Sequence, residues 1–188
     1  MGTIAGIFTF ILTSAFSLAS LLLIVRFLMH AFKVDRDADI TQMVANVTNP
    51  VVNPIKAMLP RIPRIELASL VLLAILGALK YTIVGYLSSG HFFGLFHLLI
   101  LVPADIVMQI CWLLFYIVLA DVIISWVAPQ LESPAIDFVK MLSTPTINLA
   151  RYLVSDQSGF DFSPWVALVV LKVIQLIITA QIPPGFFF

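Results

Sequence analysis

The stretch Thr48-Asn49-Pro50-Val51-Val52-Asn53-Pro54-Ile55-Lys56 has a counterpart 95 residues later, Ser143-Thr144-Pro145-Thr146-Ile147-Asn148-Leu149-Ala150-Arg151. At this constant offset Glu66 also aligns with Asp161, and no gap is needed. Each copy lies between two long apolar stretches. A repeated polar segment, marked by proline and flanked by hydrophobic stretches, is typical of a duplicated membrane protein. We therefore predict two homologous halves, residues 1–90 and residues 91–188.

The composition of the chain favours a membrane protein. Of its 188 residues 61% are hydrophobic and 11% are charged, and the mean hydropathy is +1.09. Soluble domains carry about 25% charged residues, so a soluble fold this apolar could not cover its surface with polar groups. The formal net charge is +0, which provides no basic field for nucleic acid. We expect membrane lipid as a partner and no nucleic acid.

Four stretches are long enough to cross a bilayer, which takes roughly 20 apolar residues. They are residues 4–32, 67–87, 106–127 and 162–182. Residues 92–102 are also apolar but too short to span, so they either extend a neighbouring helix or lie at the membrane surface. The sequence predicts an all-α membrane protein with four transmembrane helices.

Lysine and arginine distinguish the loops between these stretches. Loop 33–64 and loop 129–160 contain basic residues: Lys33, Arg36, Lys56, Arg61, Arg64, Lys140 and Arg151. Loop 88–105 contains none. Because basic loops remain in the cytoplasm, we place loops 33–64 and 129–160 there and both termini on the outer side. The halves then have the same orientation and form two parallel repeats.

Each cytoplasmic loop is expected to form a hairpin of two short amphipathic helices joined at a proline. Apolar residues of the first loop recur at i, i+3, i+4 and i+7, as in an amphipathic helix: Ile40, Met43, Val44 and Val47. Asn49 before Pro50 is typical of an N-cap followed by proline at the first helical position. Thr144 before Pro145 has the same pattern, and Ser133 is expected to cap the first helix of the second loop.

Charged residues at matching positions suggest contacts within and between the halves. Glu66 and Asp161 stand where the second and fourth spans begin, so we expect both to cap these helices. Arg26 and Asp121 lie about six residues inside their spans, where ionisable groups usually pair. If the first and third spans pack around a pseudo-two-fold axis, Arg26 and Asp121 can form an ion pair between the halves. The alternative is that Arg26 extends alone to the lipid headgroups.

Lys172 lies close to the middle of the fourth span, about 15 Å deep at 1.5 Å per residue. Lys172, Gln175 and Thr179 share one helix face, which we expect to pack on protein. Gln109 and Lys80 are candidate polar neighbours. A structural role, which we favour, makes Lys172 an interhelix or subunit contact, and a transport role makes it a midplane site. The third alternative is that its side chain extends to the lipid headgroups.

Sequence patterns for catalysis are absent. No Gly-rich phosphate loop, Ser-His-Asp set or paired-carboxylate arrangement is visible. His91, His97 and Asp105 lack the tight spacing of metal ligands, and the single Cys111 excludes a cysteine-based metal cluster. We therefore expect no enzyme activity, no catalytic residue, no cofactor and no metal.

The repeated segment resembles the signature of the YggT family of bacterial inner-membrane proteins, related to YlmG of Gram-positive bacteria and plastids. That signature is similar to T-x-P-x-x-x-P-x-[KR], followed by a proline and an acid. The first copy matches it at Thr48, Pro50, Pro54, Lys56, Pro60, Glu66, Ala68 and Ser69. The second copy matches it at Ser143, Pro145, Arg151, Asp161, Phe162, Ser163 and Pro164. It departs at Leu149 and Ser155, where prolines are expected, and Glu66 replaces the commoner aspartate.

The resemblance implies a multi-pass protein of the bacterial inner membrane. The outer side, on which the loop charges place both termini, is then the periplasm. The resemblance also implies links to osmotic tolerance and ion balance in some bacteria, to envelope growth and division in others, and to membrane-complex assembly in plastids. We expect a non-catalytic accessory or scaffold protein that binds or assembles other inner-membrane proteins or copies of itself. The alternative is a protein of ion transport, of potassium in particular, or a regulator of one. The candidate structural or partner-contact residues are Arg26, Asp121, Lys172, Gln175, Pro50, Pro54, Lys56, Pro145, Arg151, Glu66 and Asp161.

Overall fold

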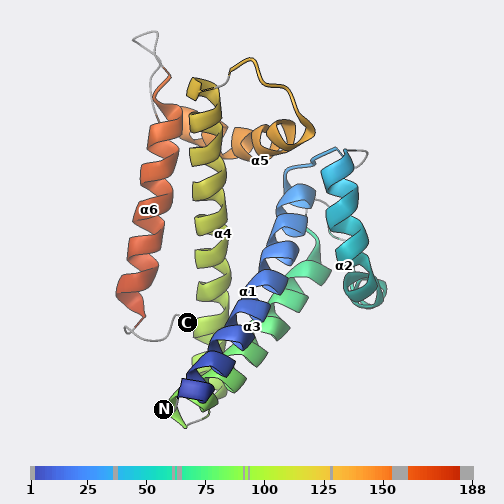
Figure 1. Ribbon diagram of the computed structural model, residues 1–188, viewed down its shortest axis with the longest axis vertical. Helices are drawn as coiled ribbons and strands as arrows, with labels where there is room; N and C mark the ends of the chain where they lie inside the picture. The colour runs from blue at the N-terminus through green and yellow to red at the C-terminus, as the bar shows by residue number, and fades with distance from the viewer. Residues whose placement is uncertain are drawn as a thin grey trace.

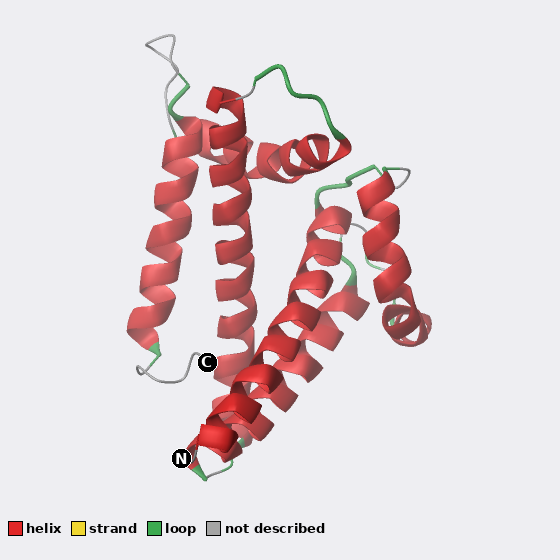
Figure 2. Cartoon of the chain, viewed as in Figure 1, coloured by secondary structure: helices red, strands yellow, loops and turns green. Residues whose placement is uncertain are grey.

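The computed structural model of the chain is all-helical. It describes residues 3–35, 38–60, 62, 65–90, 92, 94–127, 129–153 and 161–182, none of which forms a β-strand. The helices are α1 (Thr3–Ala31), α2 (Asp39–Met58), α3 (Leu67–Ser89), α4 (Leu95–Val127), α5 (Pro134–Arg151) and α6 (Ser163–Gln181). Figure 2 shows these helices joined by short loops.

The helices α1, α3, α4 and α6 are long and apolar enough to cross a membrane, which confirms the four predicted spans. Helices α1 and α4 run in one direction and α3 and α6 in the other (Figure 1). The two halves are therefore parallel repeats, as predicted. Helices α2 and α5 both lie at the end of the spans where α1 and α4 finish (Figure 1), which we call the connector end.

The third span is longer than predicted, because α4 begins at Leu95 and extends over 33 residues. The apolar residues before Pro103 thus extend a membrane helix. Leu101 and Val102 are buried together with Tyr81 of α3. At Gly77 of α3 an added Cβ would lie 2.9 Å from Val102 Cγ1, so a larger residue would hold the two helices apart. This close contact with α3 explains why the segment is helical.

The connectors differ from the predicted pairs of short helices, because each is one continuous helix. Pro50 and Pro54 lie inside α2, and Pro145 lies inside α5. An internal proline removes one backbone hydrogen bond and bends a helix without necessarily ending it. The axis of α2 turns along its length in this way (Figure 1).

The predicted N-caps at Asn49 and Thr144 are consequently wrong. Thr144 Oγ1 instead donates to the carbonyl oxygen of Lys140, 2.6 Å away and one turn earlier, a contact that favours bending. The predicted cap at the start of α5 is confirmed, because the Ser133 side chain accepts a hydrogen bond from the backbone nitrogen of Ile136 at 3.3 Å.

Both connector helices insert apolar residues into the core, and Leu142 of α5 is buried in the same cluster as residues of the first half. Val52 of α2 is buried with Ile24 of α1 and Leu73 of α3. Ile147 of α5, which aligns with Val52 in the repeat, is buried with Val118 of α4. The connector helices therefore cover the ends of the helix pairs, and many apolar side chains elsewhere on the spans are exposed.

Candidate functional site

A buried ion pair between Arg26 of α1 and Glu66, the residue before α3, lies at the connector end. Arg26 Nε is 2.8 Å from Glu66 Oε2, and Arg26 Nη2 is 3.1 Å from Glu66 Oε1. Arg26 is 8% exposed and Glu66 is 5% exposed. Two parallel contacts between a guanidinium and a carboxylate form one of the stronger charged interactions in proteins.

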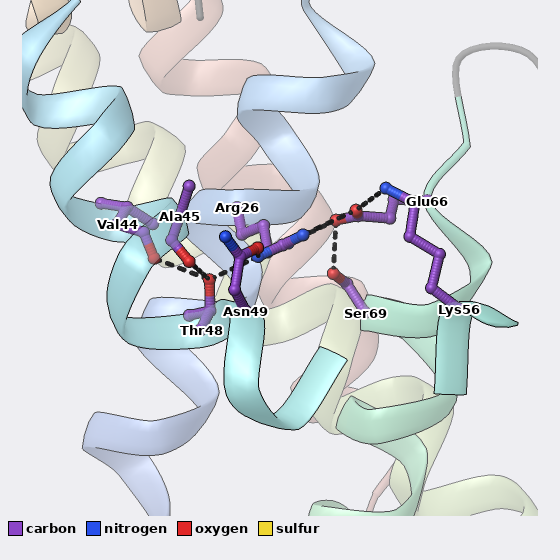
Figure 3. A network of polar contacts seen from close by, with 8 residues as sticks. All are labelled: Arg26, Val44, Ala45, Thr48, Asn49, Lys56, Glu66 and Ser69. Atoms are coloured by element: carbon purple, nitrogen blue, oxygen red, sulfur yellow. Dashed lines mark hydrogen bonds and ion pairs between the residues drawn. The ribbon is translucent and has the colours of Figure 1, made fainter. Parts of the chain in front are cut away.

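Helix α2 completes this cluster. Arg26 Nη1 donates to Thr48 Oγ1 at 2.7 Å and to Asn49 Oδ1 at 2.8 Å. Lys56 Nζ lies 3.0 Å from Glu66 Oε1, and Ser69 Oγ donates to Glu66 Oε2 at 2.8 Å. Figure 3 shows these side chains converging from three helices. The cluster therefore ties the connector helix α2 to both spans of the first half.

The surroundings of Glu66 keep it ionised. Burial alone would raise its pKa, but hydrogen bonds from Arg26, Ser69 and Lys56 outweigh burial. Together they lower the pKa of Glu66 from 4.5 to about 2. A carboxylate this acidic is unsuited to accept or donate protons near neutral pH, so the cluster is built to hold structure or to present cations.

The predicted ion pair between Arg26 and Asp121 is wrong. Arg26 bonds to Glu66, whereas Asp121 accepts a hydrogen bond from Ser143 Oγ at 2.6 Å. The physical reason is that α1 packs chiefly on α3, and α4 chiefly on α6. Arg26 and Asp121 therefore each contact groups of their own half.

Glu66 is also not the helix cap that was predicted. It stands at the start of α3, but its side chain makes no capping hydrogen bond to the backbone there. Its oxygens are taken by Arg26, Lys56 and Ser69 instead.

The corresponding cluster of the second half is more exposed and lacks the central cation. Arg151 Nη2 is 2.7 Å from Asp161 Oδ2, with both side chains exposed. Asp161 Oδ1 accepts from the backbone nitrogen of Ser163 at 2.9 Å, as expected for an acid at a helix start. Hydrogen bonds from Ser163 and Arg151 lower the pKa of Asp161 from 3.8 to about 2. Because Asp121 stands where the first half has Arg26, no guanidinium joins the three helices here.

Lys172 lies on the outer surface of α6, so the prediction that its helix face packs on protein is wrong for Lys172 and for Thr179, which is also exposed. Lys172 Nζ is 3.3 Å from Gln175 Oε1 and 4.3 Å from the ring centroid of Trp112 in α4. Gln175 is buried, and its amide nitrogen has no hydrogen-bond partner among the described residues. Lys172 is thus held by an aromatic ring and one amide oxygen.

A second buried ion pair escaped the sequence analysis. Lys80 Nζ of α3 is 3.2 Å from Asp105 Oδ2 of α4, and Gln109 Nε2 donates to the same oxygen at 2.9 Å. Asp105 was expected in a loop, so its pairing with Lys80 inside the bundle was missed, and neither Lys80 nor Gln109 contacts Lys172 as suggested. The sequence signal that could have predicted this pair is the presence of one charged residue, Lys80 or Asp105, in each of two neighbouring apolar stretches. This pair links the two halves.

No group of histidine, cysteine or acidic residues within the described ranges is arranged to hold a metal ion. His97 lies near the start of α4, and His91 falls outside the residues that the structure describes. Asp105, the third candidate ligand, is bound to Lys80 and Gln109.

Both halves of the chain are similar to known proteins. A family model described as CCB3/YggT matches residues 5–87 and again residues 100–182, which confirms the duplication. An uncharacterized protein of Pseudomonas aeruginosa is 31% identical over 171 residues, 90% of this chain and 86% of its own length. The uncharacterized protein YggT of Escherichia coli K12 is 30% identical over 172 residues, 89% of this chain and 87% of its own length. No solved structure matches the chain significantly.

The lowered pKa of Glu66 makes stability depend on acid. Its carboxylate stabilises the folded state fully above pH 4.5, and this contribution is lost as the pH falls towards about 2. The shift corresponds to about 3 kcal/mol. We predict that Glu66→Gln lowers the thermal midpoint of the purified protein in mild detergent at pH 7. Between pH 4.5 and pH 2 the thermal midpoint of the variant should fall much less than that of the parent.

Asp161→Asn is the matched control, because Asp161 has a similarly low pKa but an exposed ion pair of little energetic value. It should change the midpoint at pH 7 much less than Glu66→Gln does. Equal effects of the two substitutions on the thermal midpoint would show that burial of the Arg26 cluster adds no stability beyond that of an exposed ion pair.

Proposed function

The chain belongs to the CCB3/YggT family, and from its structure we propose that it is a non-catalytic accessory protein that binds or assembles other membrane proteins. The observation that carries this proposal is the position of Lys172. The residue is exposed on α6, roughly 14 Å from the start of that helix at 1.5 Å per residue, and so near the middle of a bilayer.

The contacts of Lys172 within the chain do not compensate the cost of this position. An ionised lysine near the bilayer centre costs roughly 2.5–3.5 kcal/mol on insertion scales. A cation–π contact such as that with Trp112 returns about 0.5–2 kcal/mol. A carboxylate on a neighbouring transmembrane helix would supply the remainder. We therefore propose that the partner is a membrane-spanning helix with an acidic residue near mid-depth.

The surface around Lys172 has the chemistry of a helix-binding face. Trp112 and Tyr116 of α4 stack with their ring centroids 5.5 Å apart, and Tyr116 is 57% exposed. Leu176 of α6, one turn beyond Lys172, is 61% exposed. Exposed aromatic residues beside one charged group are typical of the central, affinity-determining part of an interface.

The pairing of Arg26 supports an accessory role over a transport role. Arg26, a cation inside its span, is neutralised by Glu66. Two cavities of the described bundle are lined by residues at the connector end of the spans, and Lys172 lines neither of them.

Ion transport is the second candidate function, and the Lys80–Asp105 pair is the observation that favours it. A buried ion pair between transmembrane helices is a common element of ion and proton pathways. The link to osmotic tolerance that the family resemblance implies fits this candidate as well. Protein purified into potassium-loaded liposomes would then release potassium, and Asp105→Asn, which removes the charge of one partner of the pair, would abolish the release. Liposomes that retain potassium would exclude transport by this chain alone.

We further propose that the protein lies in a bacterial inner membrane with the connector end in the cytoplasm. Lysine and arginine are concentrated in the two connectors, and the described residues between α3 and α4 contain none. The positive-inside rule therefore supports cytoplasmic α2 and α5 and periplasmic termini.

The partner proposal predicts the effect of replacing Lys172. Native purification in gentle detergent should recover a stoichiometric membrane protein with the parent chain, and Lys172→Leu should reduce this recovery at least tenfold. Lys172→Arg, which keeps the charge, should retain the partner. Stability should be unaffected, because Lys172 is exposed.

Lys140→Leu, which removes an exposed lysine from α5, is the matched control and should recover as much partner as the parent. If only copies of the chain itself are recovered, or if Lys172→Leu binds as the parent does, the proposed interface is wrong.

The orientation predicts a pattern of cysteine labelling in intact cells. In a background of Cys111→Ala, Met58→Cys after α2 and Tyr152→Cys after α5 should resist a membrane-impermeant thiol reagent, and Phe92→Cys should react. All three positions are exposed in the structure, so access depends on the side of the membrane. Opposite behaviour of Met58→Cys and Tyr152→Cys would contradict the parallel placement of the connectors.

A further inference from the structure

A cavity of about 820 Å³ lies between the last turns of α1 and helix α2 at the connector end. Its basic lining residues are Arg26, Lys33 and Lys56, and Glu66 is its single carboxylate. Three cations and one anion give the lining a formal charge of +2, in a chain whose net charge is +0. Ligand pockets in proteins commonly measure about 300–1,000 Å³, so the cavity is large enough for a ligand.

Lys33 supplies a cation that no described residue neutralises. Arg26 and Lys56 both bond to Glu66, whereas the Lys33 ammonium forms no hydrogen bond or ion pair within the described part of the chain. Lys33 ends α1 in a left-handed conformation with φ 55°, where glycine is usually preferred. This turn places the exposed Lys33 at the rim of the cavity.

Thr41 independently indicates a missing ligand. It lines the cavity from the first turn of α2, is 5% exposed, and its Oγ1 has no hydrogen-bond partner. Buried hydroxyl groups are almost always hydrogen-bonded, because leaving them unpaired costs free energy. A buried hydroxyl without a partner, in the wall of a cationic cavity and in the first turn of a helix, is a candidate donor to an anion bound there.

The second half of the chain lacks this arrangement. At the same offset Arg26, Lys33 and Thr41 are replaced by Asp121, Ala128 and Ile136. The cavity beside Asp121 measures about 220 Å³, and its lining contains Asp121 and Asp161 but no basic residue. The cationic cavity is thus a property of the first repeat. The fold that the two repeats share does not explain it, because the second repeat has the same fold without such a cavity.

We propose that this cavity binds a phosphate-bearing anion, held by Lys33 and Thr41 beside the Arg26 cluster. Lysine and arginine side chains, a hydroxyl and a helix N-terminus are the groups with which proteins bind phosphate. The cavity lies where lipid headgroups meet the ends of the spans, so a phospholipid headgroup and free phosphate are the two sources of this chemistry.

The test is ligand binding to the full-length protein in a non-ionic detergent, with three probes. They are inorganic phosphate, followed by calorimetry, and short-chain phosphatidylglycerol and short-chain diacylglycerol, both followed by native mass spectrometry. Binding of phosphate identifies a small anion, and binding of phosphatidylglycerol without phosphate identifies the lipid headgroup. Diacylglycerol should not bind, because it lacks the phosphate.

Two substitutions locate the binding in the cavity. Lys33→Gln should weaken it about tenfold, and Thr41→Val about fivefold, because each removes one donor to the anion. Lys33→Arg should preserve binding. Lys140→Gln, an exposed lysine of α5, is the matched control and should have no effect.

Thermal unfolding of each variant without ligand should match that of the parent, because neither Lys33 nor the Thr41 hydroxyl has a side-chain partner to lose. The proposal is overturned if none of the phosphate-bearing probes binds. It is also overturned if diacylglycerol binds as well as phosphatidylglycerol, or if Lys140→Gln weakens binding as much as Lys33→Gln.

Discussion

The first half of the molecule depends on one buried ion pair, between Arg26 and Glu66. Removing one partner of such a pair leaves an isolated charge in a site of low polarity, at a cost of about 3–5 kcal/mol. The position of Arg26 on α1 therefore requires the start of α3 to stay close. Because the same guanidinium also bonds to Thr48 and Asn49, it holds the bent connector α2 against both spans. The ion pair thereby joins the two membrane helices α1 and α3 at one end. Hydrophobic packing alone would not select one arrangement of the two helices over another.

The two repeats share a backbone plan but have diverged in charge. Val52 and Ile147 fill equivalent places in the two cores, so packing has been preserved. At the position of Arg26, in contrast, the second repeat has Asp121 with only a serine as its partner. The first repeat consequently presents a cationic cavity and the second a small acidic one. The halves meet through Lys80 and Asp105, a contact between non-equivalent positions. The two repeats thus share one backbone fold, and substitutions of single charged residues give their connector ends different chemistry.

The sequence predicts the fold well because its signals are local. Apolar length identified the four spans, and the 95-residue offset identified the parallel repeat. The ion pairs were harder to predict from the sequence, because they depend on which helices pack together. Symmetry suggested Arg26 and Asp121 as partners, yet α1 packs on α3, and the nearest carboxylate belongs to Glu66. The prolines suggested helix ends, but they lie inside continuous helices, whose apolar residues Val52 and Ile147 are held in the core. Thr41 carried no recognisable signal, because its unpaired hydroxyl is visible only in three dimensions.

The most direct test of the Arg26–Glu66 interaction is a double-mutant cycle on thermal stability in detergent. Arg26→Met, Glu66→Gln and the double variant would be compared with Arg26→Met, Asp121→Asn and their double variant. The structure predicts strong coupling in the first cycle, about 2 kcal/mol or more between Arg26 and Glu66. It predicts additive effects in the second cycle. Additivity of Arg26 with Glu66, or strong coupling of Arg26 with Asp121, would contradict the arrangement of helices described for this protein.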